Sequence, residues 1–234
     1  MMRFPELEAW GAALAVFSDR SDGDCAAHSA AVNTRKRFLE QCGVSIESLA
    51  CPRQVHGNHV AIVGASDPGR GGGPANVIGD ADAVISNVAG IALGVAVADC
   101  VPVYLVAKGG GVGGLVHAGR QGTFLNIAGN AVRAIEGHFA VPAEGLCAVI
   151  GPSAGPCCYE VSEAMAENFA AAGGIRRGRV LDLWETNRRQ LAEAGLPEAQ
   201  ILVIGRCTIC DGAFYSYRAS GTKERNLAVL ALRP

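Results

Sequence analysis

Three residues far apart in the chain have side chains that bind transition metals. They are His56, Cys100 and His117, and each lies close to glycine or proline at the end of an apolar stretch. Two imidazoles and one thiolate suit a catalytic zinc, because three protein ligands leave a fourth position for water or substrate. A lone free cysteine is more often simply buried. The prediction of a metal site therefore depends on all three residues converging.

The segment after His117 offers a place for an anion beside this metal set. A helix is predicted to begin there with Thr123 as its N-cap, and unpaired backbone N–H groups at a helix start attract phosphate or carboxylate. The candidate substrate contacts in this segment are Gly119, Arg120, Gly122 and Thr123. Asp99 precedes Cys100, and neighbouring strand residues point to opposite faces, so Asp99 is a candidate for supporting the site or pairing with a charge.

Two further groups of cysteines could compete for a metal. Cys207 and Cys210 form a C-x-x-C pair, and Cys157 and Cys158 are adjacent. A four-cysteine zinc site normally combines two C-x-x-C pairs, and the chain has no second pair of that spacing. Adjacent cysteines rarely close a disulfide comfortably, so we expect Cys157 and Cys158 to divide between the core and the pocket. The sequence thus argues against zinc at these cysteines.

The composition is that of a compact, sheet-rich, enzyme-like protein. Half of the 234 residues are hydrophobic, 18% are charged, and the formal net charge is −2. This charge provides no general attraction for nucleic acid or for an anionic membrane surface. We therefore expect a single domain over residues 1–234 with no nucleic-acid or membrane partner, and nothing in the sequence indicates a protein partner.

The cellular compartment is inferred from the N-terminus and the cysteines. The N-terminus lacks the apolar core and cleavage site of a signal peptide, and nine cysteines without an export signal point to a reducing compartment. The apolar stretch 89–107 contains Asp99 and Pro102, which favours two buried strands over a membrane span. A cytoplasmic protein is expected.

Apolar periodicity predicts a mixed α/β fold. From Ile91 to Val97 bulky residues alternate with alanine or glycine, which predicts a strand with one nearly flat face that another segment approaches closely. Further strands are predicted at 60–63, 101–107, 112–116, 146–150, 180–183, 201–204, 214–217 and 227–232. Helices are predicted at 25–41, 122–139, 162–172 and 185–194, from apolar residues at helical spacing.

Several individually unusual segments occur in order along nearly the whole chain. They are QVHG at 54–57, DADAVISN at 80–87, ADCVPV at 98–103, HAG at 117–119, GPSAGPCCYEV at 151–161, LDLWETNRRQL at 181–191, CTIC at 207–210 and FYSYR at 214–218. Together they resemble the YfiH-like proteins, also called the laccase-domain family. The resemblance implies a one-domain α/β sandwich of mixed β-sheets flanked by helices. It also implies a catalytic centre with one zinc held by the residues matching His56, Cys100 and His117.

The same resemblance implies a purine nucleoside enzyme. Similar members phosphorolyse adenosine, inosine, guanosine and methylthioadenosine, and deaminate adenosine. For phosphorolysis, we expect a phosphate near residues 119–123, helped by Arg218 or Arg120, and Tyr159 against the base. For deamination, zinc would lower the pKa of a water molecule to about 7, but no glutamate matches the H-x-E signature of zinc deaminases, so no proton shuttle is assigned.

One departure from the family bears on the choice of substrate. Family members usually continue HAG with tryptophan and arginine, whereas Arg120 and Gln121 occupy those places here. The change removes an aromatic surface and moves the guanidinium by one position. The three metal-ligand positions are intact, so substrate preference is affected more than metal binding.

Three alternatives use the same residues differently. A copper polyphenol oxidoreductase is compatible with a His2Cys set, although five histidines are too few for a multicopper cluster. A metal-free amide hydrolase could use a Cys100 thiolate generated by His117 or His56. A nucleoside-binding protein with a structural metal would bind ligand without forming product.

Overall fold

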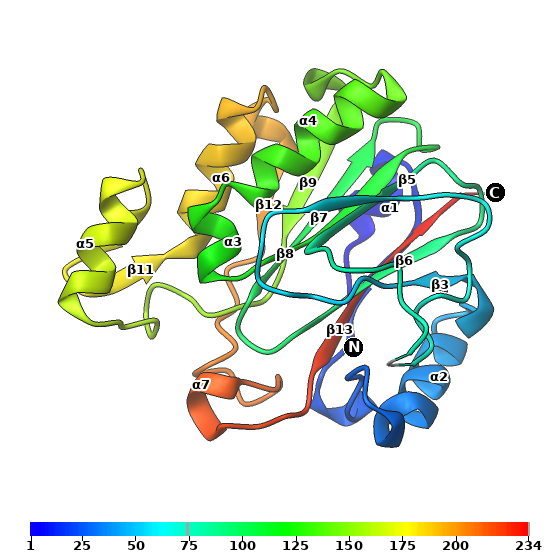
Figure 1. Ribbon diagram of the computed structural model, residues 1–234, viewed down its shortest axis with the longest axis horizontal. Coiled ribbons are helices and arrows are strands. Elements are labelled where there is room, and N and C mark those ends of the chain that lie inside the picture. Colours follow the sequence, from blue (N-terminus) through cyan, green and yellow to red (C-terminus); the bar gives the residue numbers. More distant parts are fainter. Residues whose placement is uncertain (74, 234) are drawn as a thin grey trace.

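The computed structural model describes residues 1–73 and 75–233. Two large β-sheets pack face to face, and helices cover the outer face of each sheet (Figure 1). This arrangement confirms the predicted α/β sandwich of mixed sheets flanked by helices. Among the described residues, no helix combines the length and apolarity needed to span a bilayer.

The first large sheet has six strands. They are β4 (Val60–Val63), β5 (Ala83–Ser86), β7 (Val101–Ala107), β8 (Gly113–Ala118), β9 (Leu146–Ile150) and β12 (Ile201–Val203). Their spatial order is β12-β9-β7-β8-β5-β4, and the central pairs are antiparallel. The outer pairs β12–β9 and β4–β5 are parallel, so the sheet is mixed.

The second large sheet has five strands. They are β1 (Met2–Arg3), β2 (Ala12–Phe17), β3 (Leu49–Ala50), β6 (Ala92–Val97) and β13 (Asn226–Leu232). In the order β1-β2-β13-β6-β3, the last strand of the chain, β13, lies beside β2 from its N-terminal part. A separate hairpin is formed by β10 (Ile175–Arg177) and β11 (Val180–Asp182).

Seven α-helices lie within the described residues. They are α1 (Pro5–Trp10), α2 (Val32–Gln41), α3 (Arg120–Phe124), α4 (Ile127–Phe139), α5 (Glu163–Ala171), α6 (Leu183–Glu193) and α7 (Tyr217–Ser220). Helices α4 and α6 pack on the six-stranded sheet, and α2 packs on the opposite side of the molecule, against the five-stranded sheet (Figure 1).

The core between the two sheets is built from apolar residues and includes a buried hydrogen bond that links the sheets. Leu93, Val149 and Leu230 belong to the buried cluster shared by the facing sheets. Tyr104 on β7 is also fully buried there, and its hydroxyl donates to the carbonyl oxygen of Val16 on β2 at 2.8 Å. As predicted, the flat face of β6 is closely covered, since a Cβ at Gly94 would lie 2.7 Å from Cys51 Sγ.

Three predicted elements differ in the structure. The helix expected at 25–41 begins only at Val32. The helix expected at 122–139 is divided into α3 and α4 at Asn126, which adopts a left-handed φ of 57° and caps α4 through a hydrogen bond from the backbone N–H of Gly129. Thr123 is therefore not an N-cap but lies inside α3, whose N-cap is Gly119.

The segment 214–217 is the third difference, because it is irregular rather than a strand. The side chain of Asn226 accepts from the backbone N–H of Tyr215 and donates to its carbonyl oxygen. Ser216 then caps the short helix α7 by accepting from the backbone N–H of Ala219. These side chains satisfy backbone groups that a neighbouring strand would otherwise pair.

Candidate functional site

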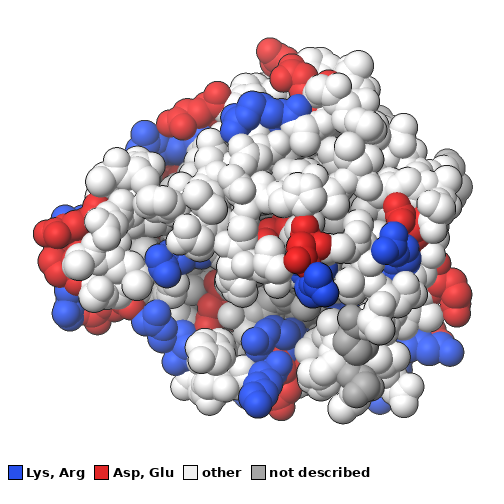
Figure 2. Space-filling model, viewed as in Figure 1, with Lys and Arg blue, Asp and Glu red and all other residues white. Residues whose placement is uncertain are grey.

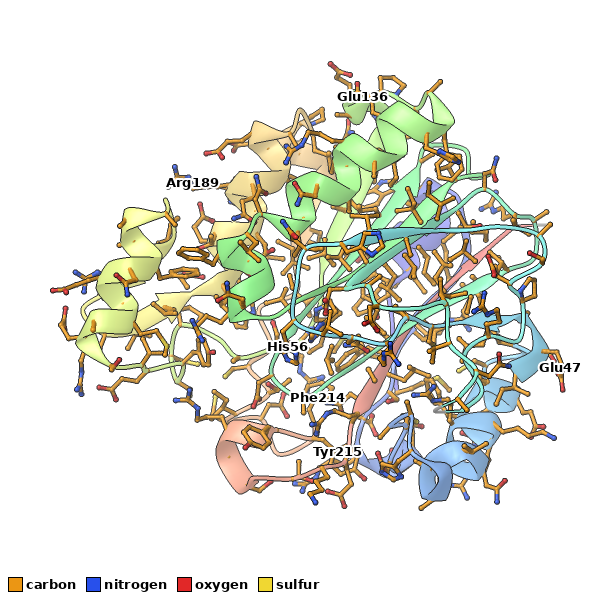
Figure 3. The ribbon with its side chains drawn as sticks, viewed as in Figure 1. Glu47, His56, Glu136, Arg189, Phe214 and Tyr215 are labelled. Atoms are coloured by element: carbon orange, nitrogen blue, oxygen red, sulfur yellow. The ribbon has the colours of Figure 1, made fainter. Side chains whose placement is uncertain are left out.

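The three predicted metal ligands meet near the connection through which the chain passes from one large sheet to the other. The connection from β6 to β7 crosses from the five-stranded to the six-stranded sheet and carries Cys100. His117 lies near the end of β8, beside β7, and His56 lies in the loop after β3 (Figure 3). One ligand atom from each of these residues lies within 4.8 Å of the other two.

The ring geometry leaves room for an ion among these atoms. Cys100 Sγ lies 3.9 Å from His56 Nε2, and the two imidazole rings meet edge to face with centroids 4.8 Å apart. A tetrahedral zinc with bonds of about 2.3 Å to sulfur and about 2.0 Å to nitrogen separates such donors by roughly 3.5 Å. Cys100 Sγ and His56 Nε2 therefore need to approach each other by only about 0.4 Å to share one ion.

Asp82 organises this site, although sequence reasoning assigned it no role. Its buried carboxylate accepts from His117 Nδ1 at 2.8 Å and from the backbone N–H groups of His56 at 2.9 Å and Gly57 at 2.6 Å. A carboxylate on one ring nitrogen directs the other nitrogen towards a metal and fixes the tautomer. Asp82 thus orients the His117 side chain directly, and it holds the loop of His56 through the backbone N–H groups of that loop.

The loop containing His56 is under backbone constraint. His56 has a left-handed φ of 60°, an uncommon conformation for a residue with a side chain. The hydrogen bonds to Asp82 hold this conformation, which places an otherwise exposed imidazole beside Cys100. Constraint of this kind occurs where the surrounding contacts determine the geometry of a functional site.

Asp99 supports Cys100 from outside the ligand cluster. Asp99 also has a left-handed φ, of 85°. Its carboxylate accepts from the Thr208 hydroxyl at 2.7 Å and from the backbone N–H of Arg218 at 2.6 Å. Asp99 therefore supports the site by accepting hydrogen bonds from the Thr208 hydroxyl and the Arg218 backbone amide.

Electrostatics at the three ligands favours the metal-binding form of the cysteine. Burial opposes ionisation of Cys100, but the adjacent His117 and His56 outweigh this effect and lower the pKa of its thiol. Burial likewise disfavours the charged form of His117, while Cys100 and Asp82 raise its pKa. The thiolate is the form that binds metals, so the two histidines favour the required charge state of Cys100. Histidine binds a metal only as neutral imidazole, so His117 releases its proton when a metal binds.

Two of the predicted substrate contacts are glycines packed against the ligands. A Cβ at Gly119 would lie 3.0 Å from Cys100 Sγ and 3.2 Å from His56 Cδ2. A Cβ at Gly122 would lie 3.1 Å from the carbonyl oxygen of Gly57. Both positions therefore allow the start of α3 to approach the ligands closely.

Thr123 faces the interior rather than the opening of the site. Its side chain is fully buried, and its hydroxyl accepts from Asn187 Nδ2 on α6 at 3.0 Å. The structure thus gives Thr123 the role of joining α3 to α6. Since α3 has only five residues, it presents little of the dipole expected of a longer helix.

Aromatic and basic side chains lie near Cys100, one of the three candidate ligands. The Arg218 guanidinium lies over the Tyr159 ring, 5.0 Å from its centroid, and donates to the carbonyl oxygen of Glu160 at 2.6 Å. Burial and Cys100 raise the pKa of Tyr159, whereas Arg120 and Arg218 oppose the rise, which places all three groups near the tyrosine. Basic side chains also lie on this face near α3 and α7 (Figure 2).

Arg120 borders a second opening as well. Together with Gln121 and Phe124 it lines a cleft between α3 and α5, closed on the far side by Met165 and Phe169. Phe124 is partly exposed there. The cleft offers an apolar surface close to the positions where family members usually have tryptophan and arginine.

The two groups of cysteines considered as competing metal ligands form a single cluster of four. Cys157, Cys158, Cys207 and Cys210 each offer a sulfur within 4.8 Å of the others. The expectation that one adjacent cysteine enters the core is wrong, because Cys157 is exposed and Cys158 is partly exposed. The adjacent pair takes the place of the second C-x-x-C pair that the sequence lacks.

Comparison with known proteins places this arrangement in a family. A family model described as multi-copper polyphenol oxidoreductase laccase matches residues 19–233. The chain belongs to the YfiH-like, or laccase-domain, family. The match confirms the resemblance drawn from the motifs. It covers the whole six-stranded sheet, strands β3, β6 and β13 of the five-stranded sheet, and all the ligands described above.

Curated members of the family are named as enzymes. Purine nucleoside phosphorylase YlmD of Geobacillus stearothermophilus is 36% identical over 215 residues, covering 86% of this chain and 78% of the relative. Adenosine deaminase RL5, from an unknown prokaryotic organism, is 31% identical over 205 residues, covering 81% and 77%. These relatives identify the laccase-domain chain as an enzyme.

Solved structures of the family have the same fold. The crystal structure of YlmD from Geobacillus stearothermophilus matches with a TM-score of 0.90 at 32% identity, over 97% of this chain and 94% of that chain. The crystal structure of the Bacillus licheniformis hypothetical protein YfiH matches with a TM-score of 0.86 at 24% identity, over 94% and 92%. The fold of the laccase-domain chain is therefore that of both structures.

Proposed function

We propose that the protein is a zinc-dependent purine nucleoside phosphorylase that also deaminates adenosine. The observation that carries the proposal is the convergence of His56, Cys100 and His117 on one point, in a chain similar to a named purine nucleoside phosphorylase. The named adenosine deaminase among the relatives supports the second activity. The proposed substrates are adenosine, inosine, guanosine and methylthioadenosine.

The donor set fits zinc with an open position. Two imidazoles and one thiolate, with a carboxylate behind one imidazole, match the requirements of a catalytic zinc site. When bound there, zinc supplies Lewis-acid stabilisation of developing charge and lowers the pKa of a water molecule. A multicopper centre fits less well, since His28 pairs with Asp24 and His138 lies on α4, away from the cluster.

For phosphorolysis, the chain's own side chains bind and orient the two substrates. Tyr159 offers an aromatic face to the base, and Arg218 and Arg120 offer positive charge to phosphate. A phosphate oxygen attacks the anomeric carbon of the sugar while the bond to the purine nitrogen breaks, and the base leaves with the bonding electrons and then takes up a proton. The side chains contribute positioning and charge stabilisation.

Deamination needs a proton shuttle that the phosphorolysis reaction does not. The Asp82 carboxylate is already engaged by backbone N–H groups and by His117. It therefore acts as a positioning residue, and the proposal assigns it no proton transfer to substrate. We expect deamination to be the slower of the two activities for this reason.

The test combines metal analysis with a nucleoside panel assayed with and without phosphate. We expect phosphate-dependent release of free purine base, together with ammonia release from adenosine that does not need phosphate. Cys100→Ala should abolish both activities and the bound metal, while Cys42→Ala, at a cysteine on the far side of the five-stranded sheet, should keep both. Full activity of Cys100→Ala with the metal lost would exclude the mechanism.

The alternatives give different results in the same samples. Stoichiometric copper with blue absorption would favour a copper oxidoreductase. Covalent labelling of Cys100 by an electrophile, unaffected by prior chelation, would favour a cysteine hydrolase. Tight nucleoside binding without product at any phosphate concentration would indicate a binding protein.

A further inference from the structure

Two turns bring four cysteines together outside the proposed catalytic centre. Cys157 and Cys158 lie in a turn closed by the backbone N–H of Cys158, which donates to the Gly155 carbonyl oxygen at 3.0 Å. Cys207 and Cys210 lie in a second turn, closed by the Asp211 N–H donating to the Cys207 carbonyl oxygen at 2.9 Å. All four sulfurs lie within 4.8 Å of one another.

The spacing of these sulfurs fits a single tetrahedral ion. Zinc–sulfur bonds of about 2.3 Å place the four sulfurs of a tetrahedron about 3.8 Å apart. Cys157 Sγ and Cys210 Sγ are separated by 3.8 Å, and every other pair lies within 4.8 Å, so no pair needs to contract by more than about 1 Å. Four thiolates around one ion are typical of a structural site, which has no open position.

Backbone hydrogen bonds hold the two turns in register. The N–H of Ser153 donates to the Arg206 carbonyl oxygen at 3.2 Å, and the N–H of Thr208 donates to the Ser153 carbonyl oxygen at 3.0 Å. The N–H of Gly155 donates to Cys207 Sγ at 3.2 Å, a contact that stabilises a thiolate. The position of each cysteine thus follows from the fold and not from flexible side chains alone.

We propose that Cys157, Cys158, Cys207 and Cys210 bind a second, structural zinc ion. It differs from the proposed catalytic zinc in its ligands and in being closed to substrate. The site does not depend on the proposed nucleoside activity. Its sequence signature is a C-x-x-C pair combined with an adjacent cysteine pair about fifty positions earlier in the chain.

This second zinc would stabilise the segments that border the catalytic centre. Thr208, between Cys207 and Cys210 in the chain, donates a hydrogen bond from its hydroxyl to the carboxylate of Asp99, which precedes Cys100. Cys158 is followed by Tyr159, which lies against Arg218. The ion would therefore hold Asp99 and Tyr159 in place beside the proposed catalytic centre.

Zinc content of matched variants tests the proposal. We expect two zinc ions per chain in the protein as purified in zinc-supplemented medium and in the control Cys42→Ser. Cys207→Ser and Cys210→Ser should each retain one zinc ion, held by the catalytic ligands. Cys100→Ala should also retain one, held by the four cysteines, so the two sites are distinguished by which variant loses which ion.

Cobalt substitution of the unmutated protein provides a test that does not depend on the folding of a variant. Cobalt bound to four thiolates gives stronger sulfur-to-metal charge-transfer absorption than cobalt bound to one. We expect this strong band in the cobalt-loaded protein and in Cys100→Ala, and its loss in Cys157→Ser. A single zinc lost only in Cys100→Ala, iron in place of zinc, or a disulfide among these cysteines in non-reducing peptide mapping would each overturn the proposal.

Discussion

At the scale of single residues, one carboxylate explains how the metal ligands are held. Asp82 lies between two alanines, is fully buried, and accepts hydrogen bonds from one ligand side chain and from the backbone beside another. Burial alone would raise its pKa, but His117 and the backbone N–H groups lower it below the usual aspartate range. Asp82 is therefore ionised at neutral pH, and its stabilising contribution is present there and is lost only as the pH falls through this lowered pKa.

The Asp82→Asn variant should weaken metal binding. The amide keeps the shape of the side chain but turns an NH2 group towards groups that donate hydrogen bonds. Loss of such a supporting partner typically lowers metal affinity about 10- to 100-fold. Competition with a chelator measures this, with Asp80→Asn as the control, since Asp80 is an exposed neighbour paired with Arg53. Equal affinity of both variants would contradict the role of Asp82.

The Gly119→Ala variant should displace ligands without unfolding the protein. Its methyl group would lie 3.0 Å from Cys100 Sγ and 3.2 Å from His56 Cδ2, which is too close for both to stay in place. We expect reduced zinc affinity and kcat with a nearly unchanged midpoint of thermal unfolding. Gly137→Ala is the matched control, because a Cβ there meets nothing within 4 Å and should stabilise α4 by up to about 1 kcal/mol. Unchanged zinc affinity in Gly119→Ala would show that the ligands tolerate the methyl group.

At the scale of elements, the division between α3 and α4 determines how α3 lies against the metal ligands. A single helix through 122–139 would require regular backbone at Asn126, whose left-handed conformation instead starts a new helix. The short helix α3 is then free to turn towards the ligands, and Asn187 on α6 holds it through Thr123. Apolar spacing correctly located the helical residues but could not locate the break, because buried residues occur on both sides of it, in α3 and in α4.

Two substitutions of Asn126 should distinguish the contribution of its capping hydrogen bond from that of its left-handed backbone conformation. Asn126→Ala loses the hydrogen bond from Gly129 and places a Cβ in the left-handed region, so unfolding free energy should fall by about 2 kcal/mol. Asn126→Gly removes the same hydrogen bond but accepts the φ of 57°, so it should be the milder change. Urea denaturation measures both. An equal loss in the two variants would mean that the backbone conformation contributes nothing.

At the scale of the whole molecule, the sandwich brings together residues that are remote in the chain. The crossing from β6 to β7 carries Cys100 between the sheets, and Tyr104 on β7 then links the sheets through its hydrogen bond to Val16. The relative placement of the sheets therefore affects the placement of the metal ligands. Packing of the apolar core and the geometry of the site are coupled through this connection.

The Tyr104→Phe variant tests the link between the sheets. It removes the buried hydroxyl and leaves the Val16 carbonyl oxygen without this donor, which should lower the unfolding free energy by about 1–2 kcal/mol. Chemical denaturation measures the change. Tyr217→Phe, at an exposed tyrosine on α7, should be nearly neutral. A loss of equal size at both positions would argue against a specific inter-sheet contribution.

The sequence by itself determined the kinds of donor, the family and most strands, because alternation and apolar spacing are local properties of the chain. His56, Cys100 and His117 could be named from residue type and motif. Sequence reasoning could not find the support from Asp82, the break at Asn126 or the irregular segment 214–217. Each depends on a particular hydrogen bond between a side chain and a backbone group. Only the tertiary structure decided that two adjacent cysteines face a C-x-x-C pair, because the register of two turns is set by hydrogen bonds between segments about fifty residues apart.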